Sequence, residues 1–409
     1  MATLGTVSYG LQLNGVRKFV GGTQTATKGI ASFNKGLVVA TASIGAIGFA
    51  LKHLADASGK FSEGLAAVGA VTKATASDMD MLKRAAIQAG IATQFSPTEA
   101  VDGLLALSTA GQTATQATKT LIPVLNLAAG SLGQLSTAEA GMAIVGTMNT
   151  YGMAADKAGE VTDKLLRITQ LTNFQTRDFS AGLAKAAAKS TVFGQSLDDT
   201  LIVMGLLRNA NIDASSAATA YTMAVQRVAT DTKALNTMQK LGVSLYDKQT
   251  GKTRAFMDLI TELKPKIEGL SDATRNKALK DMFGARAITA YNAIAKAQVT
   301  VTRDGTQVVL KGADAIEHLR NNVASATGVS KEFTGALLDT YEGQKKLLAG
   351  SISTLKVVAG DEFANAFKPF ISNAIGGIND LIATLQAMTP EAKRQLVEQT
   401  LEWVELAAK

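Results

Sequence analysis

Two pairs of adjacent carboxylates are the residues whose types and spacing could support acid–base chemistry. They are Asp198 with Asp199, and Asp361 with Glu362. Paired carboxylates act as general acid and base when their surroundings push their pKa values apart. Both pairs also suit the first turn of a helix, where the helix macrodipole favours acidic residues. We interpret both pairs as helix-start residues.

Histidine and cysteine, the other common catalytic and metal-binding residues, are nearly missing from the sequence. His53 and His318 are the only histidines, and there is no cysteine. Thiolate catalysis, disulfides and cysteine-ligated metals are therefore excluded, and a Ser-His-Asp triad is disfavoured. The GxGxxG, GxxxxGK[ST], HExxH and GxSxG motifs are also missing. We predict no cofactor, no metal site and no enzymatic activity.

The formal net charge of +7 is spread unevenly over the 409 residues. Residues 1–60 contain six lysines and arginines but one acidic residue, Asp56. Such a segment can contact nucleic acid, an anionic membrane or an acidic protein surface. Its scattered cations match no recognisable nucleic-acid-binding module, so we predict no specific nucleic-acid partner.

Helix-start signals are the clearest local features of the chain. In "QFSPTEAVDGLLALSTAG" (94–111), Ser96 can cap a helix and Pro97 suits its first position. Glu99 can reach back to the backbone N–H of the cap, which completes a capping box. We therefore assign these three residues to structural helix capping.

Two further helix starts repeat this spacing. Ser136 precedes Glu139 by three residues, and Ser196 precedes Asp199 by three residues. The apolar residues that follow recur at helical intervals. We predict the same capping role for these four residues.

An uncharged segment, "GLVVATASIGAIGFAL" (36–51), lies between two lysines. It is shorter than the roughly 20 residues that a membrane-spanning helix needs. Its small residues form a surface suited to close helix association, and they are Ala42, Gly45, Ala46 and Gly48. We predict a buried or self-associating helix, and membrane insertion at some functional stage is the alternative.

The overall pattern predicts a mainly α, elongated multi-helix protein with a compact all-α core domain and one or two short β-hairpins. Residues 1–60 form a basic N-terminal segment with a short strand and an apolar helix. The core domain spans 61–298, a β-hairpin spans 299–312, and a helical C-terminal region spans 313–409. A strand is expected at 6–13, and a second hairpin at 243–256.

The order of several motifs resembles the conserved core domain of phage tail tape-measure proteins. The matching segments run from 61 to 294 and include "TQFSPTEAVDGLLALSTAG", "VLNLAAGSLGQLSTAEA", "YGMAADKAGEVTDKL" and "LKDMFGARA". Three sites depart from the family pattern. Tyr151 stands where Phe is usual, Ala220 and Tyr221 replace a Gly-Thr-type pair, and Asn173 and Phe174 replace small polar residues.

The resemblance implies a structural protein of the virion tail, made in the cytoplasm of a bacterial host. Such a protein would occupy the lumen of the tail tube, template tube polymerisation, set tail length and leave during genome ejection. Implied partners are further copies of the chain, the tail tube protein, tail-assembly chaperones, tail tip or baseplate proteins and the host inner membrane. The resemblance also suggests that the chain is the front part of a longer tape. The alternative function is membrane-active translocation or pore formation through 36–51.

Overall fold

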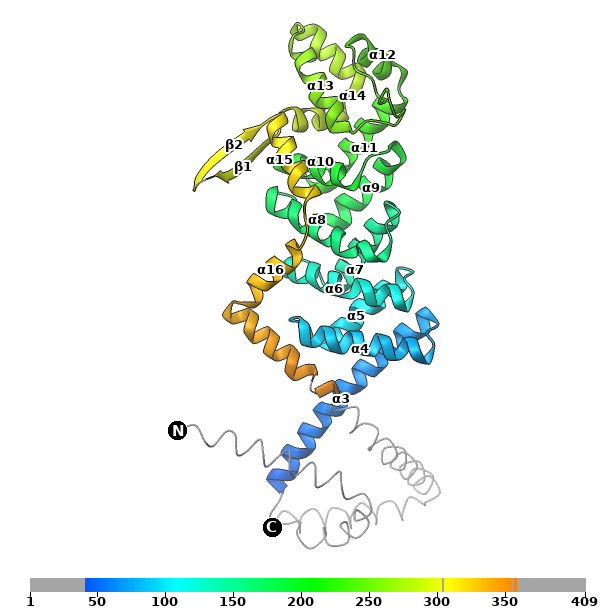
Figure 1. The fold of residues 1–409 in the computed structure, drawn as a ribbon, viewed down its shortest axis with the longest axis vertical. Coiled ribbons are helices and arrows are strands. Elements are labelled where there is room, and N and C mark those ends of the chain that lie inside the picture. The colour runs from blue at the N-terminus through cyan, green and yellow to red at the C-terminus, as the bar shows by residue number, and fades with distance from the viewer. Residues whose placement is uncertain (1–40, 304, 355, 359–409) are drawn as a thin grey trace, which may run out of the picture. The chain divides into compact units, whose positions relative to one another are not determined.

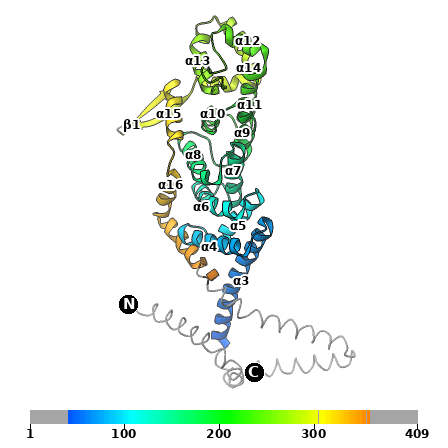
Figure 2. The same cartoon turned by 45° about the vertical axis from the view of Figure 1, so that its right-hand side comes forward.

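The computed structural model describes residues 41–358 with the exception of 304 and 355. The chain divides into two units, Ala57–Val358 and a second formed by Met1–Asp56 with Ala359–Lys409. The first unit lies almost wholly within the described residues (Figure 1, Figure 2). The strand expected at 6–13 lies outside them.

The structure confirms the mainly α prediction. The helices, in chain order, are α3 (Thr41–Thr72), α4 (Ala76–Ala92), α5 (Pro97–Thr109), α6 (Ala114–Gly130), α7 (Thr137–Thr150), the 3-10 turn η1 (Ala155–Lys157), α8 (Ala158–Leu171), the π-helical turn η2 (Phe179–Leu183), α9 (Ala184–Ser190), the 3-10 turn η3 (Thr191–Phe193), α10 (Leu197–Asn209), α11 (Ala214–Thr230), α12 (Thr232–Lys240), α13 (Phe256–Glu268), α14 (Asp272–Ala295), α15 (Ala313–Ala324) and α16 (Val329–Leu338). Residues 341–354 are also helical.

A single two-stranded antiparallel sheet is present in the described part of the chain. Strand β1 (Gln298–Arg303) pairs with β2 (Thr306–Lys311). The two-residue connection contains Gly305, whose φ of 75° suits a tight hairpin turn. The hairpin expected at 243–256 is reduced to one isolated bridge between Tyr246 and Thr253, flanked by backbone hydrogen bonds from Asp247 to Lys252 and from Arg254 to Leu245. The Asp247 carboxylate accepts two backbone N–H groups at the tip of the loop.

Within the described unit, helices pack mainly on helices that lie near them in the chain. Contacts join α4 to α5 and α6, α6 to α7 and α8, α8 to α10, α10 to α11, and α11 to α14 (Figure 1, Figure 2). One continuous apolar core runs through them and includes many alanines alongside leucine and valine. These small side chains allow close helix packing.

The same helix arrangement occurs twice in this unit, at residues 58–130 and 158–230. We call these segments the first and the second repeat. Both bounds of α10 equal the bounds of α5 plus 100, and the same holds for α11 and α6. In both repeats the three consecutive helical segments contact one another pairwise, as α4, α5 and α6 and as α9, α10 and α11.

Polar contacts also recur between the repeats at the same offset. Oγ1 of Thr72 donates to the carbonyl of Val68 at 2.8 Å, and Oγ1 of Thr172 donates to the carbonyl of Ile168 at 2.8 Å. After α5 and after α10 the chain turns through a residue with positive φ, Gly111 at 92° and Asn211 at 60°.

The hydrogen bonds that close these two turns also match between the repeats. The N–H of Gln112 donates to the carbonyl of Leu107 at 3.1 Å, and the N–H of Ile212 donates to that of Leu207 at 3.2 Å. This hydrogen bond with a positive φ defines a Schellman helix ending. Repetition of helix starts, helix ends and buried positions at one spacing identifies an internal repeat.

The repeats differ at their second helical segment. The first repeat has the continuous helix α4, whereas the second has η2, α9 and η3. Gly182 lies in η2, where an added Cβ would come within 2.8 Å of the Ala214 side chain and 3.0 Å of the Met204 side chain. The close approach of α10 and α11 to this glycine therefore accompanies the π-helical turn, which needs an irregular backbone.

The C-terminal part of the described unit returns along the repeats, and we call residues 313–354 the return segment. Its helix α15 contacts α8 and α10, and α16 contacts α6 and α8. The carboxylate of Asp163 accepts the N–H of Gly328 at 2.7 Å and the N–H of Ser330 at 2.8 Å. A buried acid of α8 thus caps the first turn of α16.

Candidate functional site

The capping residues expected in the first repeat form a closed local arrangement. The Oγ of Ser96 accepts the N–H of Glu99 at 3.2 Å, and the Glu99 carboxylate accepts the N–H of Ser96 at 2.8 Å. Pro97 occupies the first turn. Because all of these groups are engaged in starting α5, their role here is structural.

Ser136 and Glu139 form the same arrangement at α7, with distances of 3.2 and 2.8 Å. Hydrogen bonds from the backbone and side chain of Ser136 lower the pKa of Glu139. A lowered carboxyl pKa means that this side chain is anionic at neutral pH, where it stabilises the helix start. It is therefore poorly suited to act as a general acid.

Ser196 and Asp199 form a variant of this motif. The Ser196 Oγ accepts the N–H of Asp199 at 3.0 Å and donates to its carboxylate at 2.6 Å. Burial raises the pKa of Asp199, and the hydrogen bond from Ser196 and the charge of Arg320, 3.5 Å away, oppose this shift. The carboxylate therefore links α10 to α15.

The small residues expected to mediate helix association or membrane contact lie near the start of α3. They are Ala42, Gly45, Ala46 and Gly48, and they are helical. Residues 36–40 of the apolar segment fall outside the described residues. Among the residues that the structure describes, no helix has the length and apolar character needed to cross a bilayer.

A groove of about 720 Å³ lies in the described unit, and no sequence pattern predicted it. It lies where the C-terminal ends of α8, α10 and α14 meet the start of β1. Its walls combine amide, hydroxyl and apolar side chains, including Gln170, Thr172, Asn173, Asn209, Asn292, Ile212 and Val299, with Lys296 as the charged residue.

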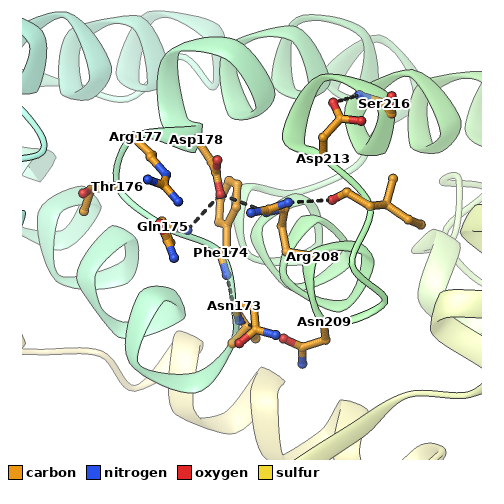
Figure 3. Close-up of polar contacts among 12 residues, drawn as sticks. Asn173, Phe174, Gln175, Thr176, Arg177, Asp178, Arg208, Asn209, Asp213 and Ser216 are labelled. Carbon is orange, nitrogen blue, oxygen red and sulfur yellow. Dashed lines mark hydrogen bonds and ion pairs between the residues drawn. The ribbon is translucent and has the colours of Figure 1, made fainter.

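A polar network holds one wall of the groove in place (Figure 3). The Asp178 carboxylate accepts from Nε of Arg208 at 3.0 Å and from the N–H of Gln175 at 3.0 Å. The Arg208 guanidinium also donates to the carbonyl of Ile212 at 2.9 Å. Arg208 and Asp178 are both largely buried, so this pair fixes the loop before η2 against the end of α10.

Asn209 connects this wall to the hairpin. Its Oδ1 accepts the N–H of Asn173 at 2.8 Å, and its Nδ2 donates to the carbonyl of Gln298 at 3.5 Å. The neighbouring Phe174 is fully buried and packs edge-on against Phe179, with ring centroids 5.5 Å apart. The family departure at Asn173 and Phe174 thus supplies both a polar link and a core residue.

Tyr151, at a second departure from the family pattern, also has a structural role. Its hydroxyl donates to Oγ1 of Thr200 at 2.8 Å, beside the hydroxyl of Ser190. The ring of Tyr221, at the third departure, is fully buried next to Phe256. Burial raises the pKa of both tyrosines, so both hydroxyls stay protonated near neutral pH.

The groove presents amide and hydroxyl groups that can donate and accept hydrogen bonds. Its lining contains no carboxylate, imidazole or thiol. No group of three or more His, Cys, Asp or Glu side chains placed to hold a metal occurs among the described residues. Sequence reasoning missed the groove because its walls come from segments more than 100 residues apart, and the one local signal was the unusual Asn173–Phe174 pair.

The sequence of this chain is similar to those of known phage tail proteins. A family described as "Phage-related minor tail protein" matches residues 83–284. The "Tape measure protein" of Pneumococcus phage Dp-1 is 26% identical over 369 residues, which cover 90% of this chain and 30% of that protein. The "Probable tape measure protein" of Escherichia phage P2 is 26% identical over 364 residues, which cover 79% of this chain and 44% of that protein. This chain therefore spans less than half the length of these two relatives. No solved structure matches it.

Proposed function

We propose that this chain, which is similar to two phage tail tape-measure proteins, is a structural component of a phage tail and occupies the lumen of the tail tube. There it templates polymerisation of the tube, sets tail length and leaves the tail during genome ejection. It has no catalytic role. The observation that carries the proposal is the similarity to two tape-measure proteins over most of this chain.

Helix geometry connects the proposal to length. An α-helix rises about 1.5 Å per residue, so 409 residues span at most roughly 610 Å as one helix. The folded unit of residues 57–358 shortens that span greatly. In this proposal the tube length is set mainly by extended stretches of the protein, and the folded unit makes contacts with other tail components.

The proposed partners follow from the position in the lumen. They are further copies of the chain, the tube protein, tail-assembly chaperones and tail tip or baseplate proteins, with the host inner membrane contacted on ejection. The chain is made in the host cytoplasm and assembled into the virion tail. A density label fused at Met1 tests the position, because the lumen of labelled tails should contain it in cryo-electron micrographs.

Deletion and insertion of whole helical turns test the measuring role. In a phage that carries this protein, removal of about 36 residues from an extended part should shorten the tail by up to about 54 Å, and insertion of the same number should lengthen it equally. Ser136→Ala is a matched control that leaves chain length unchanged. Complete tails of unaltered length after both the deletion and the insertion would overturn the proposal.

A further inference from the structure

The positive charge of the described unit comes from one stretch, residues 232–296, which we call the basic block. It contains twelve lysines and arginines against six acidic residues. The rest of Ala57–Val358 contains equal numbers of cations and anions, 20 of each. The block comprises α12, α13, α14 and their connections, and α14 packs on both α12 and α13 (Figure 1).

Several acidic residues of the block are already engaged. Glu262 pairs with Arg254 at 2.8 Å and with Lys266 at 3.0 Å. Asp258 pairs with Arg320 of α15 at 2.8 Å. The Asp247 carboxylate accepts two backbone N–H groups of its own loop. Ion pairs and hydrogen bonds within the protein therefore occupy several acidic residues of the block and leave most of its cations without an acidic partner.

Nine of the twelve cations of the block form no ion pair within the described residues. Exposed lysines among these nine lie on α12, in the loop after it and on α14, and they include Lys233, Lys240, Lys248, Lys252, Lys277 and Lys280. Lys248 and Lys252 lie in the loop closed by the Tyr246–Thr253 bridge. Tyr246 itself is 51% exposed. The loop therefore presents two cations and an aromatic ring together.

The near absence of exposed hydrophobic residues on the block indicates which kind of partner it binds. Specific protein interfaces have an apolar centre surrounded by polar residues, but Tyr246 is the one large hydrophobic residue exposed on the block. Lysines are mobile point charges that suit phosphates rather than the fixed geometry of a protein surface.

We propose that the basic block binds the phosphate backbone of nucleic acid without base specificity. This is distinct from a sequence-specific site, for which the chain has no recognisable module. It is independent of the proposed function, because failure of the unchanged chain to bind DNA would overturn this inference and leave the role in tail length untouched.

Fluorescence anisotropy of the full chain with a labelled DNA duplex of about 20 base pairs tests the proposal. We expect a dissociation constant of roughly 10⁻⁴ to 10⁻⁶ M at physiological salt that weakens steeply as salt is raised. The variant with Lys248→Glu, Lys252→Glu, Lys277→Glu and Lys280→Glu should bind at least about tenfold more weakly. Its log–log salt slope should fall by about one for each lysine that contacts phosphate.

A control with the same charge change separates this block from the basic N-terminal segment. It carries Lys18→Glu, Lys28→Glu, Lys35→Glu and Lys52→Glu, and it should keep most of the binding. Loss of binding in this control with retention in the block variant would overturn the inference. A milder block variant, with the four lysines changed to Gln, should also bind weakly. Its unchanged circular dichroism would show that the fold is intact.

Poly-glutamate separates nucleic acid from an acidic protein as the partner. If the block recognises phosphates, the labelled duplex should bind at least about tenfold more tightly than labelled poly-glutamate of equal charge at the same salt. Equal or tighter binding of poly-glutamate would overturn the inference in favour of an acidic polypeptide.

Discussion

The first and second repeats have the same helix starts and helix ends but use equivalent positions differently. In the first repeat, Glu99 contacts the residue that caps its own helix, and Thr109 donates to the carbonyl of Ala106. In the second repeat, Asp199 faces Arg320 of α15, and Asn209 reaches the Gln298 carbonyl of β1. Equivalent backbone positions thus serve local capping in one repeat and attachment of distant segments in the other.

A third pair of positions shows the same division. Glu63 is exposed, whereas its equivalent Asp163 is buried and caps α16. The first repeat therefore retains the basic helical plan, and the second has become the anchor for the hairpin and the return segment. Equivalent core positions should therefore respond alike to mutation, whereas the equivalent acids Glu63 and Asp163 should not.

Truncation of equivalent core leucines has the largest expected effect. Leu107 and Leu207 are both 0% exposed, and each carbonyl accepts the hydrogen bond that ends its helix. Leu107→Ala and Leu207→Ala should each lower the free energy of unfolding by about 2–5 kcal/mol, measured by urea denaturation with circular dichroism. Thr109→Ala, at an exposed position, should change it by less than about 0.5 kcal/mol. A near-zero effect of either leucine variant would break the equivalence of the two cores.

Removal of the acid that caps α16 should have the next largest effect. Asp163→Ala leaves the N–H groups of Gly328 and Ser330 without their partner and should cost about 1–3 kcal/mol. The matched change Glu63→Ala should cost less than about 0.5 kcal/mol. Hydrogen exchange should speed up in the return segment for the first variant only.

Asp163→Asn is a shape control for this prediction. It keeps one acceptor oxygen and should therefore fall between Asp163→Ala and the unchanged protein. Equal effects of Asp163→Ala and Glu63→Ala would show that the attachment of the return segment does not depend on this acid.

Features set by a few neighbouring residues were predictable from the sequence. The serine-first spacing of Ser96 and Ser136 placed the starts of α5 and α7, and the Asp304–Gly305 pair placed the β1–β2 hairpin. The local rules behind these features involve at most four residues. The hairpin expected at 243–256 formed only as a single bridge with two flanking backbone hydrogen bonds.

Features that join distant segments were not predictable from local patterns. Asp163 lies 165 residues before Gly328, whose N–H it accepts. Only 30 residues separate Asp178 from Arg208, but their pairing depends on the turn at η2, for which no local rule exists. The internal repeat escaped detection because substitutions such as Leu104 to Met204 and Leu121 to Tyr221 preserve burial rather than identity.

The two capping serines give the smallest and sharpest test of the comparison. Ser96→Ala and Ser196→Ala each remove the acceptor for one backbone N–H and should cost about 1 kcal/mol. After Ser96→Ala, the backbone N–H of residue 96 still donates to Glu99. Both variants lose the serine hydroxyl that donates to the carboxylate three residues on, but Glu99 is exposed to water whereas Asp199 is mostly buried. Ser196→Ala should therefore cost up to about 1 kcal/mol more at pH 7.

This extra cost should depend on pH in a direction that the pKa of Asp199 fixes. Because burial raises the pKa of Asp199 in the folded protein, protonation stabilises the fold as pH falls through that pKa toward the ordinary value for aspartate. Once protonated, the carboxyl group no longer needs the hydroxyl of Ser196 to offset a buried charge. The difference between the two variants should be full at pH 7 and shrink at about pH 4 in urea denaturation. A difference that stays constant over this range would mean that Asp199 is as well solvated as Glu99, and the contrast between the repeats at this position would be lost.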